Sequence, residues 1–231
     1  YLPLIHRESI VAHLHRIPNL SRYYFYIEDD YFLMNRAILD LQLSDYFKKR
    51  IAVYRTNLKS SYDVNVSMGL WFQSTVNSTK LIRPGYKNPV IIHEHSINLF
   101  DREIIEELER TYPTQFKATM SYQNQDTETE KEPYLISVVS LFQNYLIYHL
   151  KYKELPDRDL KTTQIHSSEE NCNDSGFLST LRKELSDSKK GWVLNAQGCG
   201  ISDEYPKCDK IHNIFYDFLE DTFPTPTEYE I

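Results

Sequence analysis

The sequence predicts an α/β fold in which a mixed or mostly parallel sheet is flanked by helices. Short apolar segments typical of strands alternate with amphipathic segments typical of helices along the whole chain. The 231 residues suffice for one domain with its own core. We therefore expect a single domain over residues 1–231, with a mobile insertion around 154–190, where the sequence is polar.

Apolar periodicity and helix-ending residues place the individual elements. A helical spacing of apolar residues ends at Pro18, an aromatic run follows at 21–27, and Asp101 is a good N-cap for the apolar-striped segment after it. Pro84-Gly85 marks a turn, and residues 123–132 form a polar loop. The predicted elements are a helix at 8–16, strands at 21–27 (buried) and 50–55, a helix at 66–76, a strand at 90–92, helices at 102–112 and 134–150, a strand at 192–194 and a helix at 209–221.

Charge and composition exclude some function classes. The net charge of −7 argues against a nucleic-acid partner. No stretch approaches the roughly 20 apolar residues of a membrane helix, so no membrane segment is expected in this chain. The three cysteines form no CxxC pair and predict no zinc site. Cys199 and Cys208 either pair in an oxidising compartment or stay as free thiols.

Three acids, Glu28, Asp29 and Asp30, directly follow the predicted strand at 21–27. Open α/β sheets bind ligands beyond the carboxyl ends of their strands. Adjacent carboxylates there suit Mg²⁺ or Mn²⁺ held against a nucleotide diphosphate, because hard cations prefer oxygen ligands. On spacing alone, a solvated turn is the better explanation of the same acids, and the chain has no glycine-rich phosphate loop.

Two pairs of histidines are further candidates. His93 and His95 precede the helix that Asp101 caps, where a histidine can serve as a general base toward a hydroxyl or the pair can bind metal. An ordinary surface or packing role is the alternative. His13 and His15 lie about 200° apart around a helix, which argues against a joint metal role.

Three segments, in order, resemble conserved regions of the Stealth family of sugar-1-phosphate transferases, which includes bacterial capsule polymerases and an animal enzyme acting on lysosomal glycans. Residues 13–21 with 26–32 are similar to the family's second region. Residues 95–116, which contain Asp101-Arg102-Glu103, resemble the third region. Leu194-Asn195 and residues 223–230 resemble the fourth. The matches are specific jointly and span most of the chain.

The resemblance implies a Rossmann-like, Stealth-type domain that moves a sugar-1-phosphate from a UDP-hexose type donor to a glycan hydroxyl. This chemistry consists mostly of charge neutralisation and in-line positioning. By resemblance, Asp29 and Asp30 bind Mg²⁺ or Mn²⁺, and His95 activates or positions the acceptor hydroxyl, with Arg102 nearby. The residues assigned to donor binding in this way are Asp29, Asp30, His15, Arg16 and Asn195.

The sequence departs from the family pattern at three places. Gln125 stands where the family has an arginine, Ala196 stands where it has an aspartate, and the family's first region is absent because the chain starts after it. Gln cannot neutralise phosphate charge and Ala cannot bind metal. We therefore expect this chain to transfer sugar phosphate poorly or not at all.

Two alternative functions remain open. Gln125 and Ala196 favour a catalytically impaired Stealth-like domain that binds a glycan or a partner protein. Asp29 and Asp30 alone also fit a metal-dependent glycosyltransferase that leaves the phosphate behind. The resemblance implies a Golgi-like lumen in a eukaryote, or the cytoplasm in a bacterium. Four N-glycosylation sequons weakly favour a lumen, at Asn19, Asn65, Asn77 and Asn173.

Overall fold

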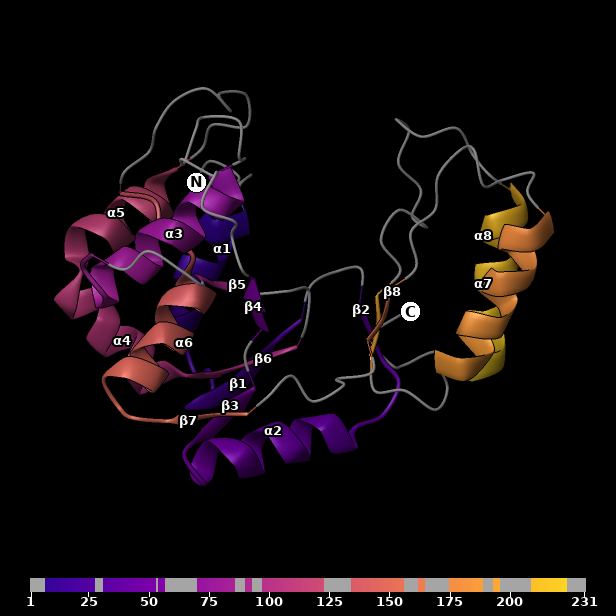
Figure 1. The fold of residues 1–231 in the computed structure, drawn as a ribbon, viewed down its shortest axis with the longest axis horizontal. Coiled ribbons are helices and arrows are strands. Elements are labelled where there is room, and N and C mark those ends of the chain that lie inside the picture. The colour runs from indigo at the N-terminus through magenta and orange to yellow at the C-terminus, as the bar shows by residue number, and fades with distance from the viewer. Residues whose placement is uncertain are drawn as a thin grey trace. The chain divides into compact units, whose positions relative to one another are not determined.

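The fold was analysed in a computed structural model, which describes residues 7–27, 31–52, 54–56, 70–85, 90–92, 97–122, 134–155, 162–164, 175–188, 193–195 and 209–223. Contacts divide the chain into two units. Unit 1 comprises Tyr1–Tyr26, Gln42–Glu94 and Asn98–Arg158, and unit 2 comprises Ile27–Leu41, His95–Ile97 and Asp159–Ile231. Both units mix helices with small sheets, so the α/β class is confirmed at this level (Figure 1). The Rossmann-like order and the single domain stay predictions.

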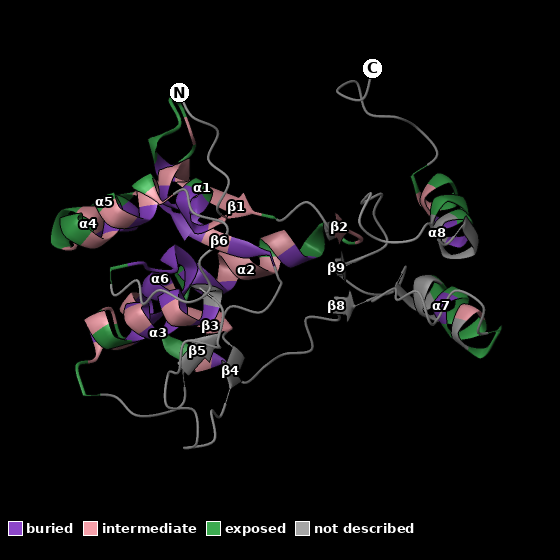
Figure 2. Ribbon diagram, turned by 90° about the horizontal axis from the view of Figure 1, so that it is seen from above, coloured by how far each residue is buried: buried purple, intermediate pink, exposed green. Residues whose placement is uncertain are grey.

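Unit 1 is built mainly from helices packed around one apolar core. Its largest fully buried side chains include Phe100, Phe116 and Phe142, which come from a strand and two helices. Figure 2 shows the buried residues concentrated on the inner sides of these helices. The helices are α1 (Arg7–His13) with the 3₁₀ turn η1 (Leu14–Arg16), α3 (Leu70–Ile82), α4 (Arg102–Thr111), α5 (Pro113–Ser121) and α6 (Val138–Tyr148), and α2 (Ala37–Phe47) begins in unit 2 and ends in unit 1.

The described strands of unit 1 form three short pairs. β1 (Tyr23–Tyr26) is antiparallel to β6 (Asn98–Asp101), with Tyr23 opposite Asp101. β3 (Arg50–Ala52) is parallel to β7 (Lys153–Leu155). β4 (Tyr54–Thr56) is antiparallel to β5 (Val90–Ile92). The described strands of this unit therefore form separate small sheets, of which one is parallel and two are antiparallel, and the predicted mixed or mostly parallel sheet stays a prediction.

The prediction of a buried, sheet-forming strand at 21–27 is only partly correct. The strand exists as β1, but all four of its residues are half-buried. Among the described residues, β1 pairs with β6 alone. The aromatic run is explained by half-buried tyrosines whose rings pack against the core. Tyr24 and Tyr26 contact the buried Phe100, with ring-centroid distances of 5.4 and 6.4 Å.

Helix boundaries follow the capping residues read from the sequence. The Asp101 carboxylate accepts a hydrogen bond from the Glu103 backbone N–H at 3.1 Å, so the predicted cap of α4 is confirmed. Ser137 caps α6 by accepting from the Ser140 N–H at 3.4 Å. The helix predicted at 134–150 therefore begins later, at Val138.

α3 lies further along the chain than the predicted helix at 66–76. It contains Ser74, Thr75, Ser78 and Thr79, all buried, which disfavour helices when exposed. Two of the hydroxyls bond across the contact with α6. Ser78 Oγ donates to the Ser137 carbonyl at 3.0 Å and accepts from the Ser137 N–H at 2.9 Å, and Thr79 Oγ1 accepts from Asn144 Nδ2 at 3.4 Å. A tertiary contact thus compensates for poor local propensity.

Unit 2 contains a three-stranded sheet and two helices. β2 (Tyr31–Leu33) is antiparallel to β9 (Val193–Asn195), which is parallel to β8 (Thr162–Gln164). α7 (Ser175–Ser188) contacts α8 (Asp209–Thr222). The buried residues of these helices are Leu181, Ile214 and Phe218.

The segment predicted as a mobile insertion, 154–190, contains described secondary structure. β8 and α7 both lie in this segment. α7 contacts α8, and its residue Leu181 is buried. Its mobility stays a prediction. The predicted final strand and final helix are confirmed as β9 and α8. Within the described residues, no helix is both long enough and apolar enough to cross a membrane.

Candidate functional site

The residues singled out in the sequence fall into three groups. His15, Arg16 and Arg102 are described with their side chains, all in unit 1. Asn195 is described by its backbone in unit 2. It lies opposite Tyr31 in the β2–β9 register, and Tyr31 directly follows Asp30 in the sequence. The others lie outside the described residues: Asp29, Asp30, His93, His95, Gln125, Ala196 and the cysteines.

Helix α4 holds the segment that follows α1. The Arg102 backbone N–H donates to the Arg22 carbonyl at 2.7 Å, and Arg102 Nη1 donates to the Leu20 carbonyl at 2.6 Å. The Arg102 side chain also pairs with Glu106, with Nε 3.5 Å from Oε1. Arg102 therefore fixes the backbone just before β1, which is the strand that leads toward the acidic residues.

Further along α4, Glu109 binds His15 and Arg16 together. His15 is buried, at 4% exposure, and its Nε2 lies 2.7 Å from Glu109 Oε2. Arg16 forms a salt bridge to the other carboxylate oxygen, and half of its side chain is exposed. Burial raises the pKa of Glu109, but hydrogen bonds from Arg16 and His15 outweigh it, so the pKa is lowered overall.

At the start of α4, a buried carboxylate gathers three partners. Asp101 is 1% exposed, and besides the Glu103 N–H it accepts hydrogen bonds from Arg22 Nη2 at 3.1 Å and from the Tyr46 hydroxyl at 2.8 Å. The hydrogen bond to Asp101 is the main cause that raises the pKa of Arg22. Burial is the largest cause that raises the pKa of Tyr46, and the hydrogen bond from the Tyr46 hydroxyl to Asp101 is the second. Asp101 is thus a structural carboxylate whose charge is fully compensated.

The predicted residues of unit 1 line one helix but do not meet at one point. Arg102 and Glu109 are seven residues apart, which is about 10 Å along a helix. His15 and Arg16 are held at the Glu109 position, and the Arg102 side chain is held near Leu20. Arg16, Arg22 and Arg102 each already pair with a carboxylate, so an anionic ligand would have to share or displace these carboxylates.

His13, at the end of α1, and His15, in η1, point to different partners. His13 Nδ1 donates to the Ser9 carbonyl at 2.8 Å within α1, whereas His15 points to Glu109. The two rings therefore serve separate partners. In the part of the chain that the structure describes, no group of three His, Cys, Asp or Glu side chains is close enough to hold a metal ion.

Sequence reasoning missed the partners of the predicted residues. Glu109 follows the buried Leu108, and a carboxylate at the margin of an apolar helix face is a signal that it accepts hydrogen bonds from side chains packed against that helix. Arg22 and Tyr46 had no such signal. They come from separate segments, since Arg22 directly precedes β1 and Tyr46 lies near the end of α2.

The sequon at Asn77 is not a plausible glycan acceptor in the folded protein. Asn77 lies in α3, and its Nδ2 donates to the Leu135 carbonyl at 2.9 Å. The next two residues, Ser78 and Thr79, are buried. A bulky glycan cannot be placed on this helix face, so this sequon gives no support for a lumenal location.

Comparison with known proteins gives one kind of relative. No family model matches the chain. The chain is 23% identical over 234 residues to capsular polysaccharide phosphotransferase SacB of Neisseria meningitidis serogroup A, and equally similar to the SacB protein of a serogroup A, serotype 4A strain. The matches cover 99% of this chain and 40% of each relative, so the chain spans well under half the length of these proteins. This similarity is consistent with the Stealth-like resemblance.

Proposed function

We propose that this chain is part of a phosphosugar transferase that moves a sugar-1-phosphate from a nucleotide diphosphate sugar to a glycan hydroxyl. The observation that carries the proposal is the similarity to a capsular polysaccharide phosphotransferase along 99% of the chain. The Stealth-like segments lie in family order within that length. The donor is of the UDP-hexose type in this proposal, and the acceptor is a glycan.

The proposed roles follow the charge that the reaction develops. Asp29 and Asp30 offer the oxygen ligands that Mg²⁺ or Mn²⁺ prefers, and a bound cation of this kind would neutralise the diphosphate. His95 takes the proton from the acceptor hydroxyl, whose oxygen forms the new bond to phosphorus while the nucleotide monophosphate leaves. Asn195, the last residue of β9 in unit 2, contributes to donor binding.

The residues of unit 1 have positioning roles in the proposal. Arg102 binds the Leu20 carbonyl and thereby orders the backbone that precedes β1. Glu109 orders His15 and Arg16, and the half-exposed Arg16 guanidinium is available to a phosphate that approaches from solvent. These contacts support a rigid frame for phosphate binding, in which preorganised cations stabilise transition-state charge.

A second function is favoured by two specific residues. Gln125 and Ala196 replace a cation and a carboxylate of the family pattern. A Stealth-like domain that has lost these groups would bind a glycan or a partner protein and transfer little. This alternative keeps binding to a glycan or a partner protein, and it differs from the first function in having little or no turnover.

The test is product analysis with the purified chain, a UDP-hexose donor, a glycan acceptor and Mg²⁺ or Mn²⁺. Release of UMP indicates phosphosugar transfer, and release of UDP indicates transfer of the sugar alone. We expect slow UMP release that His95→Ala abolishes and that His149→Ala, at an exposed histidine outside the Stealth-like segments, leaves unchanged. UDP as the product would overturn the proposal. Glycan binding with no UMP release would leave the impaired domain as the function.

A further inference from the structure

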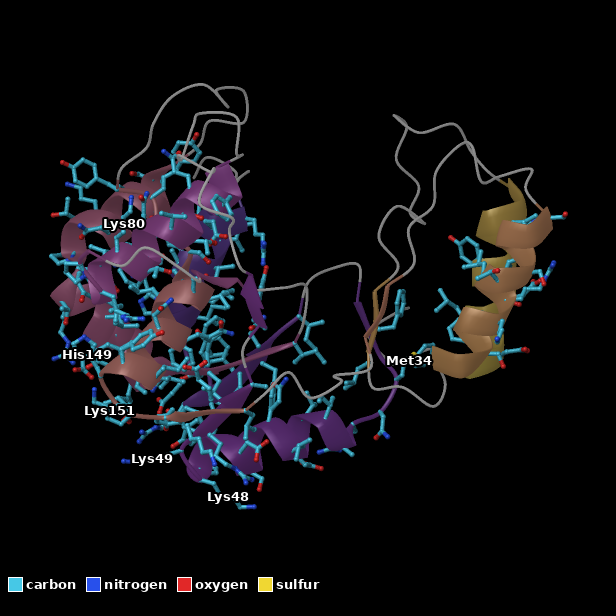
Figure 3. All side chains as sticks on the ribbon, viewed as in Figure 1. Met34, Lys48, Lys49, Lys80, His149 and Lys151 are labelled. Carbon is cyan, nitrogen blue, oxygen red and sulfur yellow. The ribbon has the colours of Figure 1, made fainter. Side chains whose placement is uncertain are left out.

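Two helix–turn–strand segments of unit 1 meet side by side and have the same design. α2 leads through Lys48 and Lys49 into β3, and α6 leads through residues 149–152 into β7. The two strands are parallel and in register, with Arg50 opposite Lys153. The turns are joined directly, because the Lys153 N–H donates to the Lys49 carbonyl at 2.8 Å. The ends of both helices therefore lie at one edge of the unit (Figures 1 and 3).

This edge is basic in an acidic chain. Residues 45–52 and 148–155 contain five Lys or Arg and two acids, whereas the whole chain has 26 Lys or Arg and 33 acids. Asp45, one of the two acids, forms a salt bridge with Arg50. Lys48, Lys49 and Lys153 are exposed, and no described carboxylate pairs with them. Figure 3 shows Lys48 and Lys49 reaching outward from the end of α2.

Helix capping alone does not account for these lysines. Lys49 and Lys151 both have a positive φ, 53° and 60°, at a position after a helix where glycine is the favoured residue. Lys151 Nζ does cap α6 by donating to the Tyr148 carbonyl at 2.7 Å. Lys153, however, is the exposed first residue of the strand β7 and not a residue at a helix end. Lys49 and Lys151 thus both occupy positions where the backbone conformation favours glycine.

An exposed aromatic ring lies beside the lysines. Phe47 is 59% exposed and directly precedes Lys48. Its ring is held edge-on by Tyr23 and Tyr46, with centroid distances of 5.1 and 5.9 Å. A rigid, exposed ring offers an apolar face to the C–H face of a sugar, while neighbouring ammonium groups attract phosphate.

We propose that this basic surface, defined by Phe47, Lys48, Lys49, Lys151 and Lys153, binds a glycan that carries phosphodiesters. The inference rests on the proposed function, because transfer of a sugar-1-phosphate to a hydroxyl leaves a phosphodiester with one negative charge in the product. A glycan extended in this way is a polyanion, and a cluster of lysines with a sugar-sized aromatic face is complementary to it.

The observations favour such a glycan over an anionic membrane. Membrane-surface binding needs apolar side chains to insert in addition to basic charge. Phe47 is the one strongly exposed large apolar side chain among residues 45–52 and 148–155, all of which are described, and its ring lies against two tyrosines. The surface therefore offers charge and stacking but little apolar area to bury in lipid.

The binding test uses the full 231-residue chain and three probes. The first is yeast phosphomannan, which carries mannose phosphodiesters, and the second is the same mannan after its phosphate has been removed. The third is a set of phosphatidylcholine vesicles with and without phosphatidylserine. The variant is Lys49→Asn/Lys153→Gln, in which Asn tolerates the positive φ at position 49. The matched control, Lys80→Gln/Lys183→Gln, removes two exposed lysines from α3 and α7.

We expect phosphomannan to bind more tightly than the dephosphorylated mannan, and the variant to lose roughly tenfold in affinity while the control loses less than twofold. The dependence of log affinity on log salt should be weaker in the variant than in the control, because two ammonium groups no longer displace counterions from the glycan. Circular dichroism verifies that both variants are folded. Equal binding of both mannans, equal losses in variant and control, or binding of anionic vesicles alone would overturn the inference.

The outcome separates this inference from the proposed function. UMP release by a chain whose phosphomannan binding does not depend on Lys49 and Lys153 would refute the basic surface and keep the transferase. Lysine-dependent phosphomannan binding with no UMP release would refute transfer and keep the basic surface as a glycan-binding site.

Discussion

Arg22 binds Asp101 with its side chain and Arg102 with its backbone. Its Nε and Nη2 atoms lie 3.2 and 3.1 Å from the Asp101 carboxylate oxygens, while its carbonyl accepts the Arg102 N–H at 2.7 Å. Arg22 therefore links the start of β1 to the end of β6 and to the first residue of α4. Because Asp101 is buried, its negative charge depends on these partners.

Replacing Asp101 by Asn should destabilise the protein by about 3 kcal/mol, because the amide cannot accept from Arg22, Tyr46 and the Glu103 N–H together. Urea unfolding followed by circular dichroism measures the loss. Glu106→Gln, which removes an exposed carboxylate from the same helix, serves as the control and should change the unfolding free energy by less than about 0.5 kcal/mol. Similar losses in both variants would contradict the assigned role.

Glu109 should make stability depend on pH on the acidic side. Its pKa in the folded protein is lowered below the ordinary 4.5. Its contribution is therefore fully present above the unfolded-state pKa and is lost as pH falls through the folded-state pKa. Glu109→Gln should cost about 1 kcal/mol at neutral pH, and the difference from wild type should shrink below about pH 4. The unfolding free energies of both proteins are measured between about pH 3 and 7. A difference between wild type and variant that does not change with pH would argue against the ion pair with Arg16 and His15.

Ser78→Ala should cost about 2 kcal/mol of unfolding free energy. The substitution removes the hydroxyl that donates to the Ser137 carbonyl and accepts the Ser137 N–H, and both groups are buried. Thermal unfolding compares this variant with Ser121→Ala, whose exposed hydroxyl bonds only within α5. If the two alanine variants unfold at the same temperature, the contact between α3 and α6 does not depend on this hydroxyl.

Restoring the family pattern should raise activity if the chain transfers phosphosugars. Gln125→Arg adds a cation and Ala196→Asp adds a carboxylate, and each such group is typically worth on the order of 10²-fold in rate. We expect the double variant to release UMP faster than the wild-type chain, and His95→Ala in the same background to abolish the gain. Gln143→Arg, on α6, is the matched control for added positive charge. No gain in the double variant would show that the residue matches at 125 and 196 are wrong.

The sequence predicted those elements whose signals are local. The Asp101 cap, the apolar face of α4 and the helix ended by Phe223-Pro-Thr-Pro are each written in a few consecutive residues, and each is found. α3 was displaced because its serines and threonines favour a helix only when α6 satisfies their hydroxyls. Tertiary contact thus overrode local propensity at that position.

The candidate site was predictable one residue at a time but not as a set of contacts. His15, Arg16 and Arg102 were named from the resemblance, yet Glu109, which binds two of them, comes from the far end of α4. Arg22 and Tyr46 reach Asp101 from two other segments, the start of β1 and the end of α2, which only the tertiary fold brings together. Contacts between distant segments leave little trace in a single sequence, whereas caps and apolar faces leave a clear one.

The parallel pairing of β3 with β7 sets the order in which unit 1 is completed during synthesis. Arg50 pairs with Lys153, so more than one hundred residues of chain separate the two partners. Pairing over such a distance is slow, because the entropy of closing the loop is paid before the contact forms. On the ribosome, β3 emerges long before β7 and exposes an unpaired edge throughout that interval. We expect the lysines before β3 to disfavour pairing of this open edge with another copy of the chain during that interval.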